Sequence, residues 1–210
     1  MRADQADGAD HRAGAAGAWY RPMVARPTDE EHRSATVLEL FFDLCFVVAV
    51  AQAAAALHHE VADGHVGDGV VGYATVFFAI WWAWMNFTWF ASAYDNDDAV
   101  YRLVTLVQIA GVLVLAAGVS QAFEHGNYLV VWLGYLIMRV AMATHWLRAA
   151  ASTTGAERRV AQRYAGGVLA CQIGWLALLF TPTAAQGWVF LAMAILEMCV
   201  PVYAERDRQT

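Results

Sequence analysis

Two carboxylates lie inside one of the most apolar stretches of the chain. Glu39 and Asp43 fall within LELFFDLCFVVAV, residues 38–50. In a helix, side chains at this spacing share one face. A charge at the centre of a membrane costs at least about 2.5 kcal/mol, so such groups normally face other protein and find a partner. The stretch therefore predicts a carboxylate site whose charge is balanced by a cationic side chain or by a bound proton.

The composition of the chain is that of a membrane protein. Hydrophobic residues make up 60% of the 210 residues and charged residues 15%, and the mean hydropathy is +0.41. A soluble domain of this size could not bury so much apolar surface. The expected partner is membrane lipid, and the net charge of -6 argues against nucleic acid. Cys45, Cys171 and Cys199 match no disulfide or zinc pattern, and no cofactor is predicted.

Six apolar stretches follow a polar first segment, and each is near the length that a helix needs to cross a bilayer. Residues 1–35 are rich in Ala, Gly, Asp and Arg, which predicts a largely disordered tail. The predicted fold is all-α, a polytopic membrane helix bundle with one six-helix transmembrane domain over residues 36–204. The predicted spans are residues 36–57, 70–92, 100–121, 127–147, 165–181 and 186–204.

The arginines predict the orientation of the bundle, because positive charge near the ends of the spans is retained in the cytoplasm. Arginine lies in the segment before the first span, in alternate loops and after the sixth span, whereas the intervening loops contain none. Both termini are therefore predicted to be cytoplasmic. Residues 1–35 and 205–210 form the two predicted cytoplasmic tails.

A polar layer is predicted at one depth of the bundle. With a rise of about 1.5 Å per residue, each of the six spans places one polar side chain about 9 to 12 Å from its cytoplasmic end. Glu39 and Arg102 lie nearer to the inner surface. Arg139 is the natural counter-ion of Asp43 or Glu197, and contact between Asp43 and Arg139 is expected, directly or through one side chain or water. The layer comprises Asp43, Asn86, Gln108, Arg139, Gln172 and Glu197.

Each of these polar residues also has a purely structural interpretation. Glu39 follows Thr36 at the spacing of a capping box and can simply close the start of a helix. Asp43 with Arg139 can be a buried ion pair that only sets the register of the helices. The amides of the layer can hold membrane helices together by hydrogen bonds.

No catalytic motif is recognised in the sequence. The run His59-Glu60-Val61-Ala62-Asp63 departs from the zinc motif HExxH, because Asp stands at the second ligand position. No third-ligand motif follows it, so the default interpretation is a solvated polar loop. An enzyme is therefore not predicted.

The stretch LELFFDLCFVVAV closely resembles the first membrane helix of the bacterial low temperature requirement A (LtrA) family, which has an L-E-L-F-F-D-L-x-F-V pattern. Residues 81–84, WWAW, look like the second helix of that family, and Arg139 looks like the Arg of its fourth helix. The resemblance covers roughly residues 34–204 and implies a multi-pass protein of the bacterial inner membrane. Family members commonly continue into a second set of helices, so a homo-oligomer, most simply a dimer standing in for the two halves, is expected.

A second resemblance is to the six-helix potassium leak channels of lysosomes and prokaryotes, whose first helix carries an F-S-D signature. Residues 41–43, FFD, match its Phe and its Asp, which would place Val48 at the apolar pore constriction. Residues 84–86, WMN, look like the W-x-N stretch of the second helix. The hypothesis that follows is conduction or transport of a small cation or a proton through the polar layer. The alternative is a non-conducting membrane scaffold, in which the layer only ties the helices together.

Overall fold

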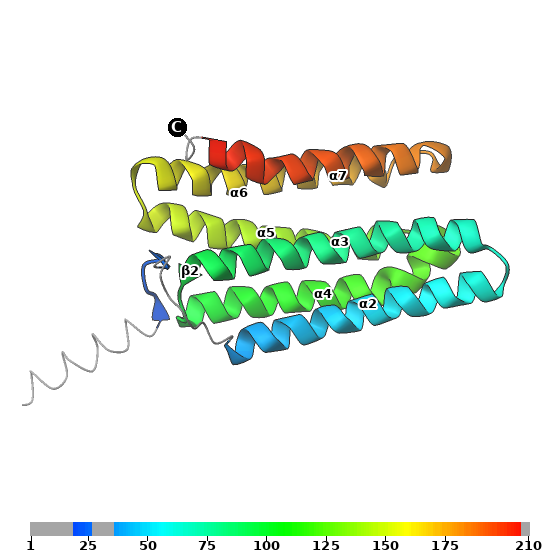
Figure 1. Ribbon diagram of the computed structural model, residues 1–210, viewed down its shortest axis with the longest axis horizontal. Coiled ribbons are helices and arrows are strands. Elements are labelled where there is room, and N and C mark those ends of the chain that lie inside the picture. Colours follow the sequence, from blue (N-terminus) through cyan, green and yellow to red (C-terminus); the bar gives the residue numbers. More distant parts are fainter. Residues whose placement is uncertain (1–18, 27–35, 207–210) are drawn as a thin grey trace, which may run out of the picture.

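Six long helices run along a common axis, and consecutive helices are antiparallel (Figure 1). The computed structural model describes residues 19–26 and 36–206. The predicted all-α membrane bundle with six helices is confirmed. Its helices are α2 (Val37–Ala62), α3 (Val66–Ala93), α4 (Ala99–His125), α5 (Leu129–Ser152), α6 (Gly155–Leu178) and α7 (Thr183–Glu205).

Five of the six described helices, all except α6, are long and apolar enough to cross a membrane. The helix α6 begins well before its predicted span, and its first turns carry Glu157, Arg158 and Arg159. These charges lower its mean hydropathy, whereas the predicted span at residues 165–181 contains no charged residue. The remainder of α6 therefore has the composition of the other helices and packs between α5 and α7.

The α4–α5 pair holds the centre of the bundle, and three glycines bring the two helices together. A Cβ atom on Gly134 of α5 would overlap the backbone nitrogen of Leu115 and lie 2.6 Å from the carbonyl oxygen of Gly111 on α4. A Cβ atom on Gly118 would lie 2.7 Å from the backbone nitrogen of Val131. Small residues of this kind let membrane helices approach until their backbones touch.

Part of the predicted disordered tail is folded onto the bundle. Residues 19–26 include the strand β1 (Val24–Ala25), which pairs antiparallel with β2 (Tyr94–Asp95) between α3 and α4. The side chain of Met23 is only 2% exposed. Predicted disorder is therefore wrong for residues 19–26, because their partners lie far along the chain and composition carries no sign of them. The remaining parts of the predicted tails, residues 1–18, 27–35 and 207–210, lie outside the described residues.

Both ends of the described chain lie at the same end of the bundle (Figure 1). The strand β1 and the last turn of α7 both border one cavity there, which is lined by Ala25 and Glu205 among others. That this end faces the cytoplasm stays a prediction from the arginines. It can be tested at three exposed loop positions, Asp63 and Pro182 at the far end and Thr154 at the terminal end.

We expect single cysteines at positions 63 and 182 to react with an impermeant thiol reagent added to sealed cells, and a cysteine at position 154 to be protected. The three native cysteines are replaced by Ala for this experiment, and all three test positions should react once the cells are permeabilised. Labelling of position 154 in intact cells would reverse the orientation.

Candidate functional site

Two deeply buried charges of opposite sign form an ion pair between α5 and α7. The side chains of Arg139 and Glu197 are 1% and 2% exposed, and Arg139 Nη2 contacts Glu197 Oε1. The hydroxyl of Tyr135 accepts from Arg139 and donates to Glu197 Oε2 at 2.7 Å. The indole N–H of Trp175 on α6 donates to the same carboxylate oxygen at 2.9 Å. Three helices therefore converge on a single carboxylate.

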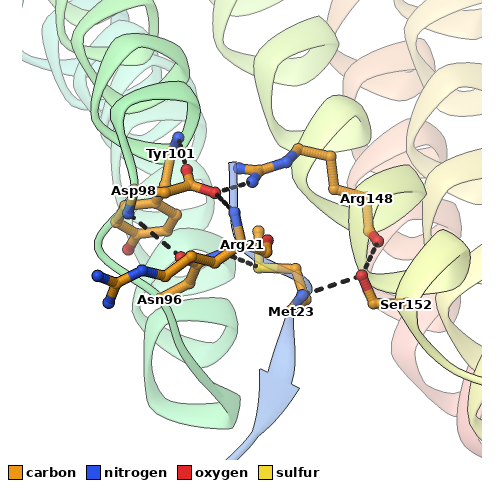
Figure 2. Close-up of polar contacts among 7 residues, drawn as sticks. All are labelled: Arg21, Met23, Asn96, Asp98, Tyr101, Arg148 and Ser152. Atoms are coloured by element: carbon orange, nitrogen blue, oxygen red, sulfur yellow. Dashed lines mark hydrogen bonds and ion pairs between the residues drawn. The ribbon is translucent and has the colours of Figure 1, made fainter. Parts of the chain in front are cut away.

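A second buried ion pair lies at the terminal end of the bundle (Figure 2). Asp98 caps the start of α4 by accepting the backbone N–H of Tyr101 at 2.6 Å. Its other carboxylate oxygen lies 2.5 Å from Arg148 Nη2 and accepts the backbone N–H of Arg21 at 2.6 Å. Burial by itself would raise the pKa of Asp98, but the N–H groups of Arg21 and Tyr101 and the Arg148 guanidinium hold this pKa below its ordinary value of 3.8. Asp98 is therefore ionised at neutral pH.

Between the two ion pairs, α4 and α5 bring further polar side chains together. Thr105 Oγ1 lies 3.4 Å from Nε2 of His145, and Gln108 Nε2 donates to the carbonyl oxygen of Met138 at 3.4 Å. Of the nine buried polar or charged side chains in the described residues, all except Asn86 and Gln172 belong to this row or to the ion pairs. We refer to this row and the two ion pairs together as the polar seam. It comprises Asp98, Thr105, Gln108, Tyr135, Arg139, His145, Arg148 and Glu197.

The polar seam has spare hydrogen-bonding capacity. Within the described residues, Gln108 Oε1, His145 Nδ1, Arg139 Nε and two guanidinium nitrogens of Arg148 have no protein partner. Gln108 and Arg139 line a cavity of about 10 Å³, which otherwise has apolar walls. A cavity of this size is close to what one water molecule needs. The middle of the seam is therefore narrow and polar, with room for a single water beside the Arg139–Glu197 pair.

Two adjoining cavities, together called the funnel here, extend from the opposite end of the bundle toward the same ion pair. Its mouth is a cavity of about 360 Å³ whose lining includes Glu60 and Asp68. Its neck is an apolar space of about 50 Å³ that reaches Tyr135 and Trp175, the two side chains that donate to Glu197. Mouth and neck share the lining residues Thr75, Tyr128, Leu178 and Phe190.

The two carboxylates of the first predicted span, Glu39 and Asp43, lie apart from the funnel and the polar seam. Glu39 forms the predicted capping box with Thr36, with reciprocal hydrogen bonds of 3.2 and 3.3 Å. Asp43 lies on the exposed side of α2 and accepts the indole N–H of Trp84 at 2.8 Å. The expected Asp43–Arg139 contact is wrong, because Arg139 is enclosed with Glu197 while α2 turns Phe42 and its other buried residues inward.

Of the other residues predicted in or near the polar layer, some lie in the polar seam and some lie outside it. Arg102 is exposed and pairs with Asp97 at 2.6 Å, so it does not reach into the bundle. Asn86 donates to the carbonyl oxygen of Trp82 on its own helix. Both amide atoms of Gln172 are buried and have no protein partner in the described part of the chain. Gln108, Arg139 and Glu197 are the three predicted residues that the structure brings into one site.

Val48, the predicted pore constriction, is 47% exposed on the outer face of α2. Sequence reasoning missed Asp98, Thr105, His145 and Arg148. Part of their signal is a spacing of three residues, from Thr105 to Gln108 and from His145 to Arg148, which places each pair on one face of its helix.

The fold and the site define a multi-pass membrane helix bundle with a buried ion pair at its centre. Residues 34–210 match the family described as Bacterial low temperature requirement A protein (LtrA). The chain belongs to this family, and the resemblance found in the sequence is confirmed.

A curated relative is the uncharacterized protein RA0937 of Rhizobium meliloti (strain 1021), which is 29% identical over 116 residues. The match covers 55% of this chain and 27% of the relative, so it spans about a quarter of the relative's length. No solved structure matches the chain.

Proposed function

We propose that this LtrA family protein conducts protons across the membrane, by way of the funnel, the Arg139–Glu197 pair and the polar seam. The observation that carries the proposal is the succession of buried polar groups that starts where the funnel ends. Tyr135 and Trp175 line the neck of the funnel and also bind Glu197. Beyond Arg139, the seam comprises the cavity shared with Gln108, the Thr105–His145 contact and the Asp98–Arg148 pair at the opposite end of the bundle.

The dimensions of the route favour a proton over a metal cation. The neck and the inner cavity are about 50 and 10 Å³, which is too narrow for an ion that keeps its hydration shell. Two buried guanidinium groups, Arg139 and Arg148, lie on the seam and oppose the entry of a free cation. A proton needs neither an open pore nor a hydration shell, because it passes along hydrogen-bonded groups. The carboxyl of Glu197, the hydroxyl of Tyr135 and the imidazole of His145 can each release and accept one.

The alternative function is a non-conducting membrane scaffold, and one observation favours it. Each buried acidic side chain of the seam already contacts an arginine, Asp98 with Arg148 and Glu197 with Arg139. In a scaffold, the ion pairs only neutralise buried charges. Substitutions in the polar seam would then change the stability of the bundle and nothing else. The two proposals therefore differ in one measurable property, which is flux.

The test is proton flux into proteoliposomes that contain the wild-type chain or the His145→Phe variant. His145 packs against Phe90 and Tyr101, with ring centroids 5.1 and 5.0 Å away, so a Phe ring fits the same surroundings. We expect at least a tenfold loss of flux with little change in unfolding temperature, because the variant removes the exchangeable group and adds no charge. The matched control is His58→Phe, at an exposed position on α2. Full flux in His145→Phe would contradict the route.

Location and assembly belong to the same proposal. The arginine distribution supports a bacterial inner membrane protein with cytoplasmic termini.

We also propose a homo-oligomer, most simply a dimer. Asp43 and Val48 both lie on the exposed side of α2, so a small-cation pore lined by these two residues requires α2 helices from neighbouring subunits. If such a pore carries the current, then Val48→Trp abolishes it and His145→Phe does not.

A further inference from the structure

Residues 19–26, here the cap segment, cover the terminal end of the polar seam (Figure 2). The segment is held by backbone contacts to three parts of the bundle. Its strand β1 pairs with β2, the backbone N–H of Arg26 donates to the carbonyl oxygen of Ala93 at 2.9 Å, and the backbone N–H of Met23 donates to Ser152 Oγ at 2.9 Å. The Met23 side chain is buried beneath the segment, at 2% exposure.

The cap segment touches both charges at this end of the seam. The backbone N–H of Arg21 donates to the same oxygen of Asp98 that binds Arg148. The guanidinium carbon of Arg148 lies 5.0 Å from the centroid of the Tyr20 ring. Asp98 and Arg148 are 1% and 8% exposed with the segment in place. With the segment in place, little of this ion pair is open to water.

The contacts between the cap segment and the bundle are of a kind that can break and re-form. The pairing of β1 with β2 covers two residues on each strand, and Trp19, Tyr20 and Val24 are 63%, 48% and 61% exposed. The contacts of the segment are one buried side chain, a few backbone hydrogen bonds and side-chain contacts that include those of Asn96 and Tyr20. An isolated pair of such short strands is not stable by itself.

We propose that the cap segment is an autoinhibitory cover, which keeps water out of the terminal end of the polar seam and so holds proton flow at a low level. The regulatory part of this inference rests on the proposed function. The covering part does not, because it concerns access of water to Asp98, Arg148 and Thr105 whether or not the protein conducts.

The test uses the full chain with its three native cysteines replaced by Ala and a single reporter, Thr105→Cys, inside the seam. The variant Arg21→Pro removes the backbone N–H that Asp98 accepts, because proline has none. The matched control is Arg21→Ala, which loses the same side chain and keeps the N–H. We expect a small water-soluble thiol reagent to label the reporter at least fivefold faster in Arg21→Pro than in Arg21→Ala. Equal labelling rates would overturn the proposal.

Proton flux into proteoliposomes is then compared for the same two changes with Thr105 in place. We expect several-fold higher flux for Arg21→Pro than for Arg21→Ala. Faster labelling with equal flux, in a protein that conducts, would overturn autoinhibition. If no chain conducts, the proposed function fails, and the labelling rates alone decide whether the segment covers the seam.

A second variant tests the cap segment in the closed state. Val24 pairs with Asp95 across the two strands, so Val24→Cys with Asp95→Cys can form a disulfide that fixes the segment on the bundle. We expect flux to fall at least threefold on oxidation and to recover when the bond is reduced. Unchanged flux on oxidation in a protein that conducts, with the disulfide verified by mass, would contradict autoinhibition even if Arg21→Pro failed to fold.

Discussion

Replacing Glu197 with Leu is expected to destabilise the bundle by about 3 to 5 kcal/mol, because the Arg139 guanidinium is then left buried without its counter-charge. Arg139 is 1% exposed, so bulk water does not reach it to replace the lost partner. The hydroxyl of Tyr135 and the indole N–H of Trp175 lose their acceptor in the same change. The measurement is the free energy of unfolding in mixed micelles, followed by tryptophan fluorescence.

Two controls separate the ion pair from the general effect of substitution. The double variant Arg139→Met with Glu197→Leu removes both charges, and it should recover most of the lost stability, since apolar replacements of buried pairs are often neutral or stabilising. The variant Asp97→Asn breaks the exposed pair with Arg102 and should cost less than about 1 kcal/mol. A Glu197→Leu variant no less stable than Asp97→Asn would mean that the buried pair does not hold α5 and α7 together.

Gly134→Ala is the second change for which we expect a large loss of stability. The added Cβ atom would overlap the backbone nitrogen of Leu115, and backbone cannot swing aside as a flexible side chain can. The α4 and α5 helices must separate to admit one methyl group, at a cost of about 1 to 3 kcal/mol. The same unfolding measurement applies, together with the fraction of protein that is recovered as a monodisperse peak from detergent.

The matched control is the same substitution on another helix. Gly166 lies on α6, and a Cβ atom there would meet nothing within 4 Å. Gly166→Ala should therefore be neutral or stabilise by up to about 1 kcal/mol, because Ala is the better helix former. If both alanines have the same effect, the close approach of α4 and α5 contributes nothing measurable.

The level of Arg139 and Glu197 along the bundle could be predicted from the sequence, but the face of the helix on which each polar residue lies could not. A rise of about 1.5 Å per residue gives depth directly, and this reasoning pairs Arg139 with Glu197 as one of two choices. The chosen partner, Asp43, is at a suitable depth but on the wrong side of α2. In a soluble helix, the apolar stripe shows which side is buried. Lipid is as apolar as the core, so α2 carries no such stripe and Asp43 can equally be placed inward or outward.

The terminal end of the bundle was missed for a different reason. Asp98 and Arg148 lie near helix ends, where charged residues are usually solvated, and the sequence contains no sign that residues 19–26 cover them. Strand pairs of two residues have no periodicity to detect. The binding place of the cap segment exists only in the folded bundle, in which α3, α4 and α5 bring Ala93, Asp98 and Ser152 to one end.

The glycine contact between α4 and α5 also limits how the protein can move. A transporter that works by alternating access rocks one group of helices against another and opens the site to each side in turn. Because the backbones of these two helices touch at Gly134 and their side chains meet at Thr105 with His145 and at Asp98 with Arg148, we expect α4 and α5 to move together as one unit. A rocking motion would then take place between this unit and the other helices, and access to the seam would change at its two ends rather than at its centre.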